Sequence, residues 1–312
     1  MTNEQNTQHC GLVAVLGAPN AGKSTLVNAL VGQKVAIVSA KAQTTRARLL
    51  GIALAETPAG HPTQIILADT PGIFAPRRRL DRAMVNAAWE GAQEADAILL
   101  VVDGRKKKLD YLEPILESLK GRPERKILVL NKVDEVAKEP LLVTAQALAG
   151  PDEDGKAQFD EVFFISALTG DGVAELKDRL AALMPEGPWH YPEDQVSDAS
   201  ERLLACEITR EQLYRQLHDE LPYDSTVRPE SYTHRKDGSV EIHQQIVIAR
   251  DSQKGIVLGK GGSKLKSIGE AARKELTELL GTRVHLFLHV KVDEKWGDDK
   301  EIYEELGLEW VK

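Results

Sequence analysis

The chain has 312 residues, an ordinary hydrophobic content of 42% and a formal net charge of −8. That length suggests about two domains, and two distant cysteines, Cys10 and Cys206, exclude a zinc cluster and a disulfide framework. No apolar run approaches the ~20 residues of a membrane span, and the first ten residues lack the basic and apolar segments of a signal peptide. We therefore expect a cytoplasmic protein, with a peripheral membrane contact left open.

The first half alternates short aliphatic runs with helical patterns. Buried strands are predicted at residues 12–16, 64–69, 97–103, 126–131 and 161–166. Helical stretches such as Leu80–Ala95 and Val173–Leu183 lie between them. Repeated strand–helix units predict an α/β domain whose mostly parallel sheet has helices on both faces. In such a sheet, ligands bind at the carboxyl ends of the strands.

The segment GAPNAGKS, from Gly17 to Ser24, follows the first strand and opens a helix, and it matches the phosphate-binding pattern G-x-x-x-x-G-K-[ST]. Glycines let successive backbone N–H groups curl around phosphate oxygens, and the helix N-terminus adds positive charge. We expect Lys23 to reach the β and γ phosphates and the Ser24 hydroxyl to bind Mg²⁺. The predicted phosphate-binding residues are Gly17, Ala18, Pro19, Asn20, Ala21, Gly22, Lys23, Ser24 and Thr25.

Two segments at later strand ends form the predicted switch. DTPG places Asp69 to hold Mg²⁺ through water and the Gly72 N–H to grip the γ-phosphate and release it after hydrolysis. In the earlier loop AQTTR, from Ala42 to Arg46, Thr45 is the expected Mg²⁺ ligand in the GTP state, with Thr44 as the alternative. The predicted switch residues are Thr44, Thr45, Asp69, Thr70, Pro71, Gly72 and Ile73.

The segment NKVD, from Asn131 to Asp134, favours guanine over adenine. The Asp134 carboxylate can accept from two adjacent N–H groups that guanine has and adenine lacks, and such paired bonds reject misfits strongly. Asn131 can bridge the base and the phosphate loop, and the aliphatic part of Lys132 can cover a face of the guanine ring. The segment SAL, from Ser166 to Leu168, ends the next strand, and its backbone N–H groups can donate to the guanine oxygen. The predicted guanine-binding residues are Asn131, Lys132, Asp134, Ser166, Ala167 and Leu168.

The second half has a different order of elements. A stretch with three prolines and a glycine, residues 184–195, breaks the alternation and predicts a domain boundary. After it, the patterns read helix, two strands joined at KDG, two helices and a strand. The predicted organisation is a flexible N-terminus 1–10, a GTPase domain 11–185, a linker 186–199, an α+β domain 200–293 and an acidic tail 294–312.

A second glycine loop, VLGKGGSKLK, lies between the last two predicted helices, in a run with six basic residues and one acid from Lys254 to Lys274. It is too short for a nucleotide loop, and G-x-x-G in this order of elements is typical of a type II KH domain, which clamps about four single-stranded nucleotides. The predicted RNA-binding residues are Ile256, Val257, Leu258, Gly259, Lys260, Gly261, Gly262, Lys264 and Lys266. We expect the acids after Asp293 to be solvated; the alternative is that they shield this loop.

The motif set GAPNAGKS, QTTR, DTPG, NKVD and SAL, followed by a KH pattern, resembles the Era family of GTPases over nearly the whole chain. The resemblance implies a monomeric, GTP-hydrolysing switch that binds the 3′ end of 16S rRNA and assists assembly of the 30S ribosomal subunit. Ile73 stands where many GTPases have a water-orienting glutamine, so slow intrinsic hydrolysis is expected. Relatives with asparagine at the position of Asn20 seat a potassium ion beside the phosphates; the alternative is an asparagine that shapes the loop.

Three other functions remain open at this point. The C-terminal domain could dock a protein partner, the chain could be a nucleotide-gated scaffold without catalysis, or the single-stranded ligand could be DNA.

Overall fold

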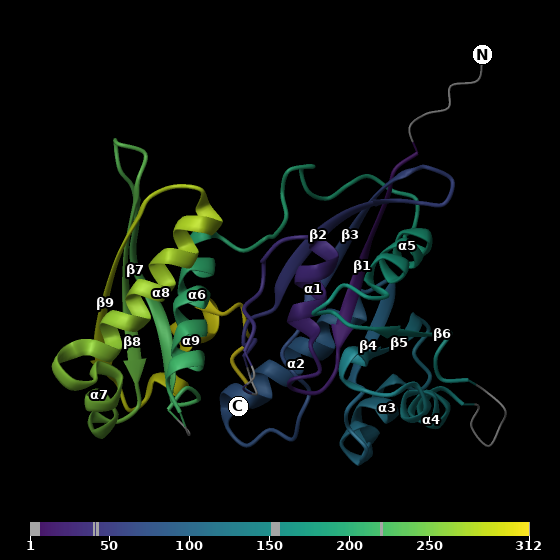
Figure 1. The fold of residues 1–312 in the computed structure, drawn as a ribbon, viewed down its shortest axis with the longest axis horizontal. Helices are drawn as coiled ribbons and strands as arrows, with labels where there is room; N and C mark the ends of the chain where they lie inside the picture. Colours follow the sequence, from purple (N-terminus) through teal and green to yellow (C-terminus); the bar gives the residue numbers. More distant parts are fainter. Residues whose placement is uncertain (1–6, 40, 42–43, 151–156, 219–220, 312) are drawn as a thin grey trace. The chain divides into compact units, whose positions relative to one another are not determined.

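The computed structural model describes residues 7–39, 41, 44–150, 157–218 and 221–311. Its contacts divide the chain into two compact units (Figure 1). The first comprises residues up to 36, 45–77 and 84–198, and the second comprises 37–44, 78–83 and 199 onward. Ala42 and Gln43 of the predicted switch loop lie outside the described residues. No helix in the described ranges is long and apolar enough to cross a membrane.

The first unit contains a six-stranded sheet in the order β2-β3-β1-β4-β5-β6. The strands are β1 (His9–Leu16), β2 (Leu49–Glu56), β3 (Pro62–Asp69), β4 (Ala97–Asp103), β5 (Arg125–Asn131) and β6 (Glu161–Ile165). All neighbours are parallel except β2, which runs antiparallel to β3 at the edge. The strand β2 was not predicted, since its alanines are weak strand formers compared with valine and isoleucine.

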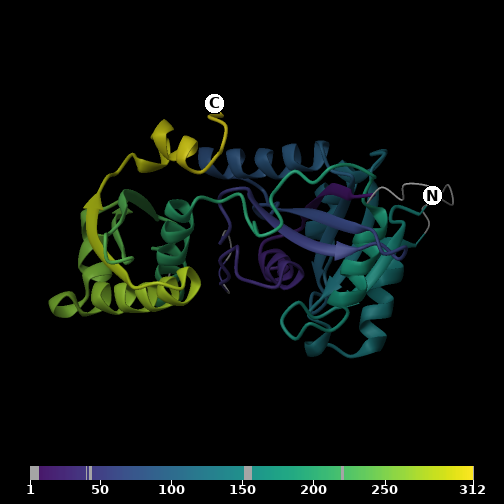
Figure 2. The ribbon, with the colours of Figure 1, turned by 90° about the horizontal axis from the view of Figure 1, so that it is seen from above.

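Helices cover both faces of this sheet, as predicted (Figures 1 and 2). The helices α1 (Lys23–Val31) and α5 (Val173–Leu183) contribute to one core layer. The opposite layer receives residues from α2 (Arg79–Gln93), α3 (Glu113–Leu119) and α4 (Lys138–Ala149). Strand β4 is buried along its whole length. The carboxyl ends of the parallel strands meet at one edge of the sheet, so the polar residues at these ends lie close together.

The second unit has the predicted order of elements and confirms the α+β fold class. Its elements are α6 (Glu201–Gln216), β7 (Ser225–His234), β8 (Val240–Ile248), α7 (Asp251–Leu258), α8 (Ser263–Leu280) and β9 (Val284–Val292). The sheet order is β7-β8-β9, with β7 antiparallel and β9 parallel to β8. Helices α6, α7 and α8 gather on one face of the sheet (Figure 2).

The acidic C-terminal segment is folded. A 3₁₀ turn at Trp296–Asp298 precedes α9 (Lys300–Glu305), whose Ile302 and Tyr303 are buried. Arg228 on β7 forms ion pairs at 2.7–3.2 Å with three carboxylates of this segment: Asp299, Glu301 and Glu305. These three acids are therefore ion-paired to β7 rather than only solvated, although Glu301 and Glu305 stay exposed.

The ends of the predicted domains also differ in detail. His9 and Cys10 lie in β1, inside the segment expected to be flexible, because they pair with β3. In the predicted linker, the Val196 carbonyl accepts a hydrogen bond of 2.8 Å from the Ile52 N–H at the sheet edge. Part of the predicted linker therefore pairs with the edge of the sheet in the first unit.

Candidate functional site

The first glycine loop has the backbone of a phosphate cradle. Gly17 and Gly22 have φ values of 147° and 97°, in a region that favours glycine. Both are also tightly enclosed: a methyl group would lie 2.3 Å from the Val101 oxygen at Gly17 and 2.2 Å from Asn131 Nδ2 at Gly22. These two positions therefore require glycine for conformation and for space.

Lys23, the first residue of α1, is buried inside this loop. Its Nζ donates to the Gly17 and Ala18 carbonyl oxygens, both at 3.2 Å. Burial lowers the pKa of Lys23 to about 8, although the nearby Asp69 carboxylate opposes this shift. A bound phosphate would favour the charged ammonium and so raise this pKa again.

Three predicted Mg²⁺ ligands lie together beside the loop. Ser24 Oγ donates to Asp69 Oδ2 at 2.7 Å and lies 2.8 Å from Thr45 Oγ1, and Thr45 Oγ1 is 3.4 Å from the same carboxylate oxygen. Two hydroxyls and a carboxylate form an oxygen-only donor set of the kind that Mg²⁺ prefers. The alternative Thr44 instead bonds the Ser39 hydroxyl and the Lys41 carbonyl oxygen.

The DTPG segment contacts the phosphate loop through its backbone. The Thr70 hydroxyl donates to the Val15 oxygen at 2.7 Å, and the Ile73 N–H donates to the Gly17 oxygen at 3.0 Å. Gly72 lies so close to Pro19 that an added methyl would be 2.8 Å from its backbone nitrogen. The Ile73 side chain is buried in the core, so it cannot orient a water molecule.

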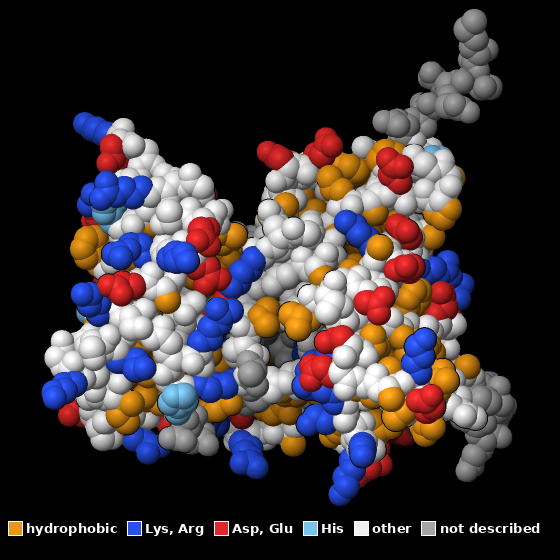
Figure 3. Space-filling model, viewed as in Figure 1, with side chains coloured by type: hydrophobic (Ala, Val, Ile, Leu, Met, Phe, Trp, Pro, Cys, Tyr) orange, Lys and Arg blue, Asp and Glu red, His pale blue; other side chains and the backbone are white. Residues whose placement is uncertain are grey.

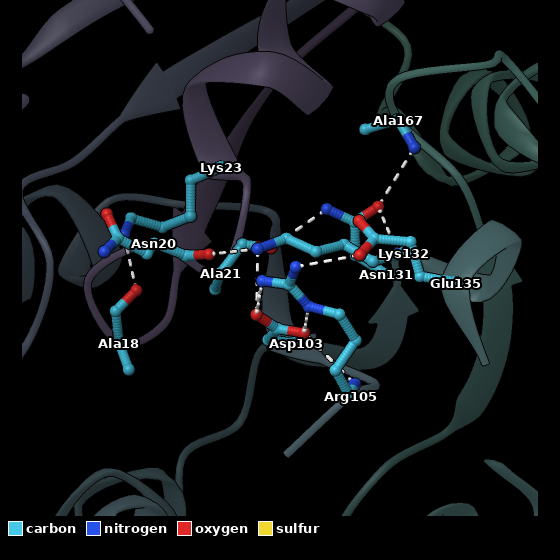
Figure 4. A network of polar contacts seen from close by, with 10 residues as sticks. All are labelled: Ala18, Asn20, Ala21, Lys23, Asp103, Arg105, Asn131, Lys132, Glu135 and Ala167. Carbon is cyan, nitrogen blue, oxygen red and sulfur yellow. Dashed lines mark hydrogen bonds and ion pairs between the residues drawn. The ribbon is translucent and has the colours of Figure 1, made fainter. Parts of the chain in front are cut away.

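Asn131 ties three motifs together (Figure 4). Its Nδ2 donates to the Ala21 oxygen of the phosphate loop at 2.9 Å. Its Oδ1 accepts from the Ala167 N–H at 2.9 Å and from the Lys132 N–H at 2.8 Å. Asn131 thus contacts the phosphate loop, as predicted, and it also accepts a hydrogen bond from the backbone of the SAL segment. The Ser166 and Ala167 N–H groups both donate within the protein, the former to the Asp171 oxygen.

Sequence reasoning missed Asp103 and Arg105, which complete this network (Figure 4). Lys132 Nζ donates to Asp103 Oδ2 at 2.8 Å and to the Asn20 oxygen at 2.6 Å. Arg105 donates to both Asp103 oxygens, at 2.9 and 2.7 Å, and to Glu135 at 3.0 Å. Burial alone would raise the pKa of Asp103, but bonds from Arg105 and Lys132 lower it to about 2.

The position of Asp103 offered a sequence signal. It ends β4 as Asn131 ends β5, and the two residues are paired in register. The carboxyl ends of adjacent parallel strands meet at one edge. A polar residue at the end of a buried strand is therefore a sequence signal that indicates Asp103 as a site residue.

The remaining predicted residues of this site lie around the same edge. Asn20 has φ 64°, a conformation that asparagine tolerates, which gives it a loop-shaping role whether or not an ion binds. Asp134 is exposed in a short 3₁₀ turn after β5, and Leu168 is 79% exposed. Thr25 follows Ser24 on α1, and Pro71 follows Thr70. A cavity of about 520 Å³ adjoins the loop, lined by Ala18, Pro19, Ala21, Asp103, Tyr111 and the basic residues 105–108.

The second glycine loop lies at the start of α8 and is built differently. Gly259, Gly261 and Gly262 have φ values of 70°, 61° and 79°. An added methyl would meet nothing within 4 Å at Gly261 or Gly262, whereas at Gly259 it would lie 2.7 Å from Lys264 Cβ. Lys260 and Lys266 are exposed and Lys264 is partly exposed.

The three apolar residues predicted to bind RNA beside this loop differ in exposure. Ile256 is 59% exposed and Leu258 is partly exposed. Val257 is fully buried among core residues, so the prediction that its side chain contacts RNA is wrong: it packs into the core from the inner side of α7.

Comparison with known proteins covers both units. Residues 12–132 match the family model described as "50S ribosome-binding GTPase", and residues 220–297 match that of the KH domain. The GTPase Era of Erythrobacter litoralis is 74% identical over 97% of this chain and 98% of its own length. That of Bradyrhizobium sp. (strain BTAi1) is 55% identical over the full length of both chains.

Solved structures of similar proteins agree. Era in complex with MgGDPNP and nucleotides 1506–1542 of 16S ribosomal RNA superposes with a TM-score of 0.86, at 35% identity over 96% of this chain and 99% of that one. A variant of Aquifex aeolicus Era, bound to GDP·AlF4⁻, gives a TM-score of 0.87 at the same identity and coverage. The fold, both glycine loops and these relatives lead to one conclusion: the chain belongs to the Era family of GTPases and hydrolyses GTP to GDP and phosphate.

Proposed function

We propose that this GTPase is a switch that binds single-stranded RNA at the 3′ end of 16S rRNA and assists assembly of the 30S ribosomal subunit. The observation that carries the proposal is the likeness, over both units, to an Era structure that contains 16S rRNA nucleotides 1506–1542. The description of the matched GTPase family model names the 50S ribosome, but that model covers only residues 12–132. The likeness that includes the second unit therefore favours the small subunit.

The G-x-x-G loop supports RNA as the ligand of the second unit. Gly261 and Gly262 leave open space around the backbone, which lets a phosphate approach closely. Lys260 and Lys266 are exposed and supply positive charge. The buried core of a protein interface is more apolar than the rest of the surface, and α7 and α8 have a single exposed large hydrophobic side chain, that of Ile256.

The direct experiment is to crosslink RNA to the protein in cells and sequence what is recovered. Enrichment of the 3′ end of 16S rRNA is expected, with its loss in a variant carrying Lys260→Glu and Lys264→Glu. Recovery of 23S rRNA, or of no preferred RNA, would overturn the proposal. Retention of 16S fragments by the variant would show that another surface holds the RNA.

For the nucleotide site, we propose that Ser24 and Thr45 bind Mg²⁺ directly and Asp69 binds it through water. Their three side chains lie within 3.4 Å of one another, and the similar Era was solved with MgGDPNP. Mg²⁺ would neutralise charge on the β and γ phosphates. Lys23 would hold the same phosphates, and Asp134 would read guanine from the rim formed by Asn131 and Lys132.

A potassium ion at Asn20 is the finer proposal for catalysis. The buried Ile73 side chain leaves water positioning to backbone groups or a partner, so an ion that offsets developing charge would matter more than usual. We expect faster phosphate release in potassium than in sodium buffer, with the difference lost in Asn20→Ala. Equal rates in the two buffers would leave Asn20 with its loop-shaping role alone.

A further inference from the structure

We propose that the loop after β4 is a second RNA-binding surface, located on the GTPase unit, that holds the phosphate backbone of RNA. The surface consists of Lys106, Lys107, Lys108 and Tyr111, and all four residues line the cavity of about 520 Å³ beside the phosphate loop. The proposed function assigns RNA only to the second unit. This inference therefore goes beyond it and takes from it only the probe, 16S rRNA.

The loop is anchored at both of its ends. At its start, the Gly104 N–H donates to the Asn131 carbonyl oxygen at 2.8 Å, and the Lys106 N–H donates to the Asp103 carbonyl oxygen at 3.0 Å. At its end, the Leu112 side chain is fully buried in the core of the first unit. The lysines between these anchors are therefore presented from a defined place, which limits the entropy that is lost when a ligand binds.

The three consecutive lysines carry a positive charge that the protein does not neutralise. They are exposed, and within the part of the chain that the structure describes, residues 106–108 form no ion pair. The neighbouring Arg105 differs, because it pairs with Asp103 and Glu135. Along the lower edge of the first unit, where β4 ends, Figure 3 shows lysine and arginine side chains.

Such a cluster favours an anionic ligand. Consecutive residues lie about 3.8 Å apart at their Cα atoms, well inside the screening length of about 8 Å at physiological salt. The charges of residues 106–108 therefore repel one another in the free protein, although the chain as a whole has a net charge of −8. Phosphates bound at the loop would relieve this repulsion.

The nucleotide of the first unit does not account for these lysines. Lys23 is already buried within the phosphate loop, and the proposed Mg²⁺ would add two positive charges beside the same phosphates. Residues 106–108 are instead exposed to solvent. Their exposure suits a ligand that is larger than a nucleotide and reaches the cavity from outside, such as a nucleic acid strand.

The same cavity presents an aromatic ring. Tyr111 is 39% exposed and lies in the 3₁₀ turn Asp110–Leu112. Burial and the nearby Asp103 carboxylate raise the pKa of Tyr111, so its ring stays neutral at physiological pH. A neutral ring beside cations can stack on a base while the cations hold the adjacent phosphates, a combination that is typical of sites for single-stranded RNA.

The test compares the binding of two RNAs by the full-length protein at several salt concentrations. The RNAs are 16S rRNA and a short fragment of its 3′ end, with about four nucleotides for the G-x-x-G loop. For 16S rRNA, Lys106→Ala with Lys108→Ala should make the slope of log affinity against log salt shallower by ~0.7 to 0.9 for each lost phosphate contact. The slope for the short fragment should not change.

A matched control removes the same charge elsewhere on the first unit. Lys120→Ala with Arg125→Ala takes two cations from the turn before β5 and from the start of that strand. The start of β5 lies at the opposite edge of the sheet from Asp103, because β4 and β5 are parallel and Asp103 pairs with Asn131. This double variant should leave both slopes unchanged.

Tyr111 gives a second readout. Tyr111→Leu should weaken the binding of 16S rRNA about five-fold, because a base–aromatic stack contributes at least that much. Tyr111→Phe keeps the ring and should keep the affinity.

Three results would overturn the inference. The first is an unchanged 16S rRNA slope in the lysine variant. The second is a lysine variant that binds 16S rRNA normally but has lost affinity for GDP, since the lysines would then serve the nucleotide. The third is a variant that binds 16S rRNA normally but binds intact 30S subunits weakly, since the partner would then be a protein. If 16S rRNA binds through these lysines but the short fragment does not bind, the inference stands and the assignment of RNA to the second unit fails.

Discussion

The two glycine loops of this chain have opposite surroundings. In the first, Gly17 and Gly22 are enclosed by neighbouring backbone and side-chain atoms, and Lys23 is buried beneath them. In the second, Gly261 and Gly262 have open space around them, and Lys260 is exposed. An enclosed cradle suits one small ligand of fixed shape, whereas an open loop suits a polymer that must enter from the side. The same residue types are therefore suited to different ligands because their surroundings differ.

The largest expected effect tests the specificity of the enclosed site. Asp134→Asn should exchange guanine for xanthine, because a donor then replaces an acceptor, and the preference for GDP over XDP should change by ~10⁴-fold. Competition binding with both nucleotides measures it. Asp171→Asn, an exposed neighbour after β6, should keep the guanine preference. An Asp134→Asn protein that still prefers guanine would show that Asp134 does not read the base.

Matched substitutions in the two loops sharpen the comparison. Gly22→Ala would press a methyl against Asn131 Nδ2 at 2.2 Å, while Gly262→Ala would meet nothing within 4 Å, although φ is positive at both. We expect a loss of turnover of about 100-fold for Gly22→Ala, since small misplacements at a reacting site are costly. For Gly262→Ala we expect only backbone strain of about 1 kcal/mol.

Turnover and thermal unfolding of both variants test this pair. Equal turnover in the two proteins would contradict the distinction between an enclosed and an open loop.

The open loop should depend on salt. If about four phosphates are neutralised, the slope of log affinity against log salt should be near −3, since each contributes ~0.7 for a single strand. Lys260→Glu with Lys264→Glu should make the slope shallower by about 1.4. Titrations of a short RNA at several salt concentrations measure it, with Lys236→Glu as the control. If the RNA affinity of the unmodified protein does not change with salt concentration, the lysine charges do not hold the RNA.

The smallest effect concerns the buried lysine. The pKa of Lys23 is about 8 in the protein without nucleotide and 10.5 ordinarily. The unfolded chain thus binds more protons between these values, and the stability of the nucleotide-free protein should rise with pH across that window. Bound phosphate favours the charged form, so nucleotide binding at pH 9 should take up about one proton.

Calorimetry in two buffers of different ionisation enthalpy counts that proton. The same measurement near pH 7.5, where Lys23 is already largely protonated, is the control and should show much less uptake. No uptake at pH 9 would mean that the ammonium stays charged in the empty loop.

Sequence patterns predicted this fold well where the signal was local. The strand β4 is an unbroken apolar run, and Gly22–Ser24 starts a helix, so both followed from residue type alone. The strand β2 did not, because its place at the sheet edge depends on pairing with β3 rather than on its own residues. The folded C-terminal segment was also not predicted, since its many acidic residues suggested a solvated tail, whereas Trp296 and Tyr303 are buried.

The site followed the same division. Ser24, Thr45 and Asp69 were predicted together from motif order, and the structure brings them together. Asp103 was not predicted, although it ends a buried strand, because its place beside Asn131 depends on the pairing of β4 with β5. Family membership also excludes the scaffold without catalysis, since the relatives are GTPases.

The central claim is that the nucleotide in the first unit controls RNA binding by the second. The direct measurement is the affinity of a 16S rRNA 3′ fragment with GDPNP, with GDP and without nucleotide. We predict that the GDPNP and GDP values differ by at least ~5-fold, a typical coupling, and that RNA changes the ratio of nucleotide affinities by the same factor. Identical RNA affinity in all three conditions would contradict the claim.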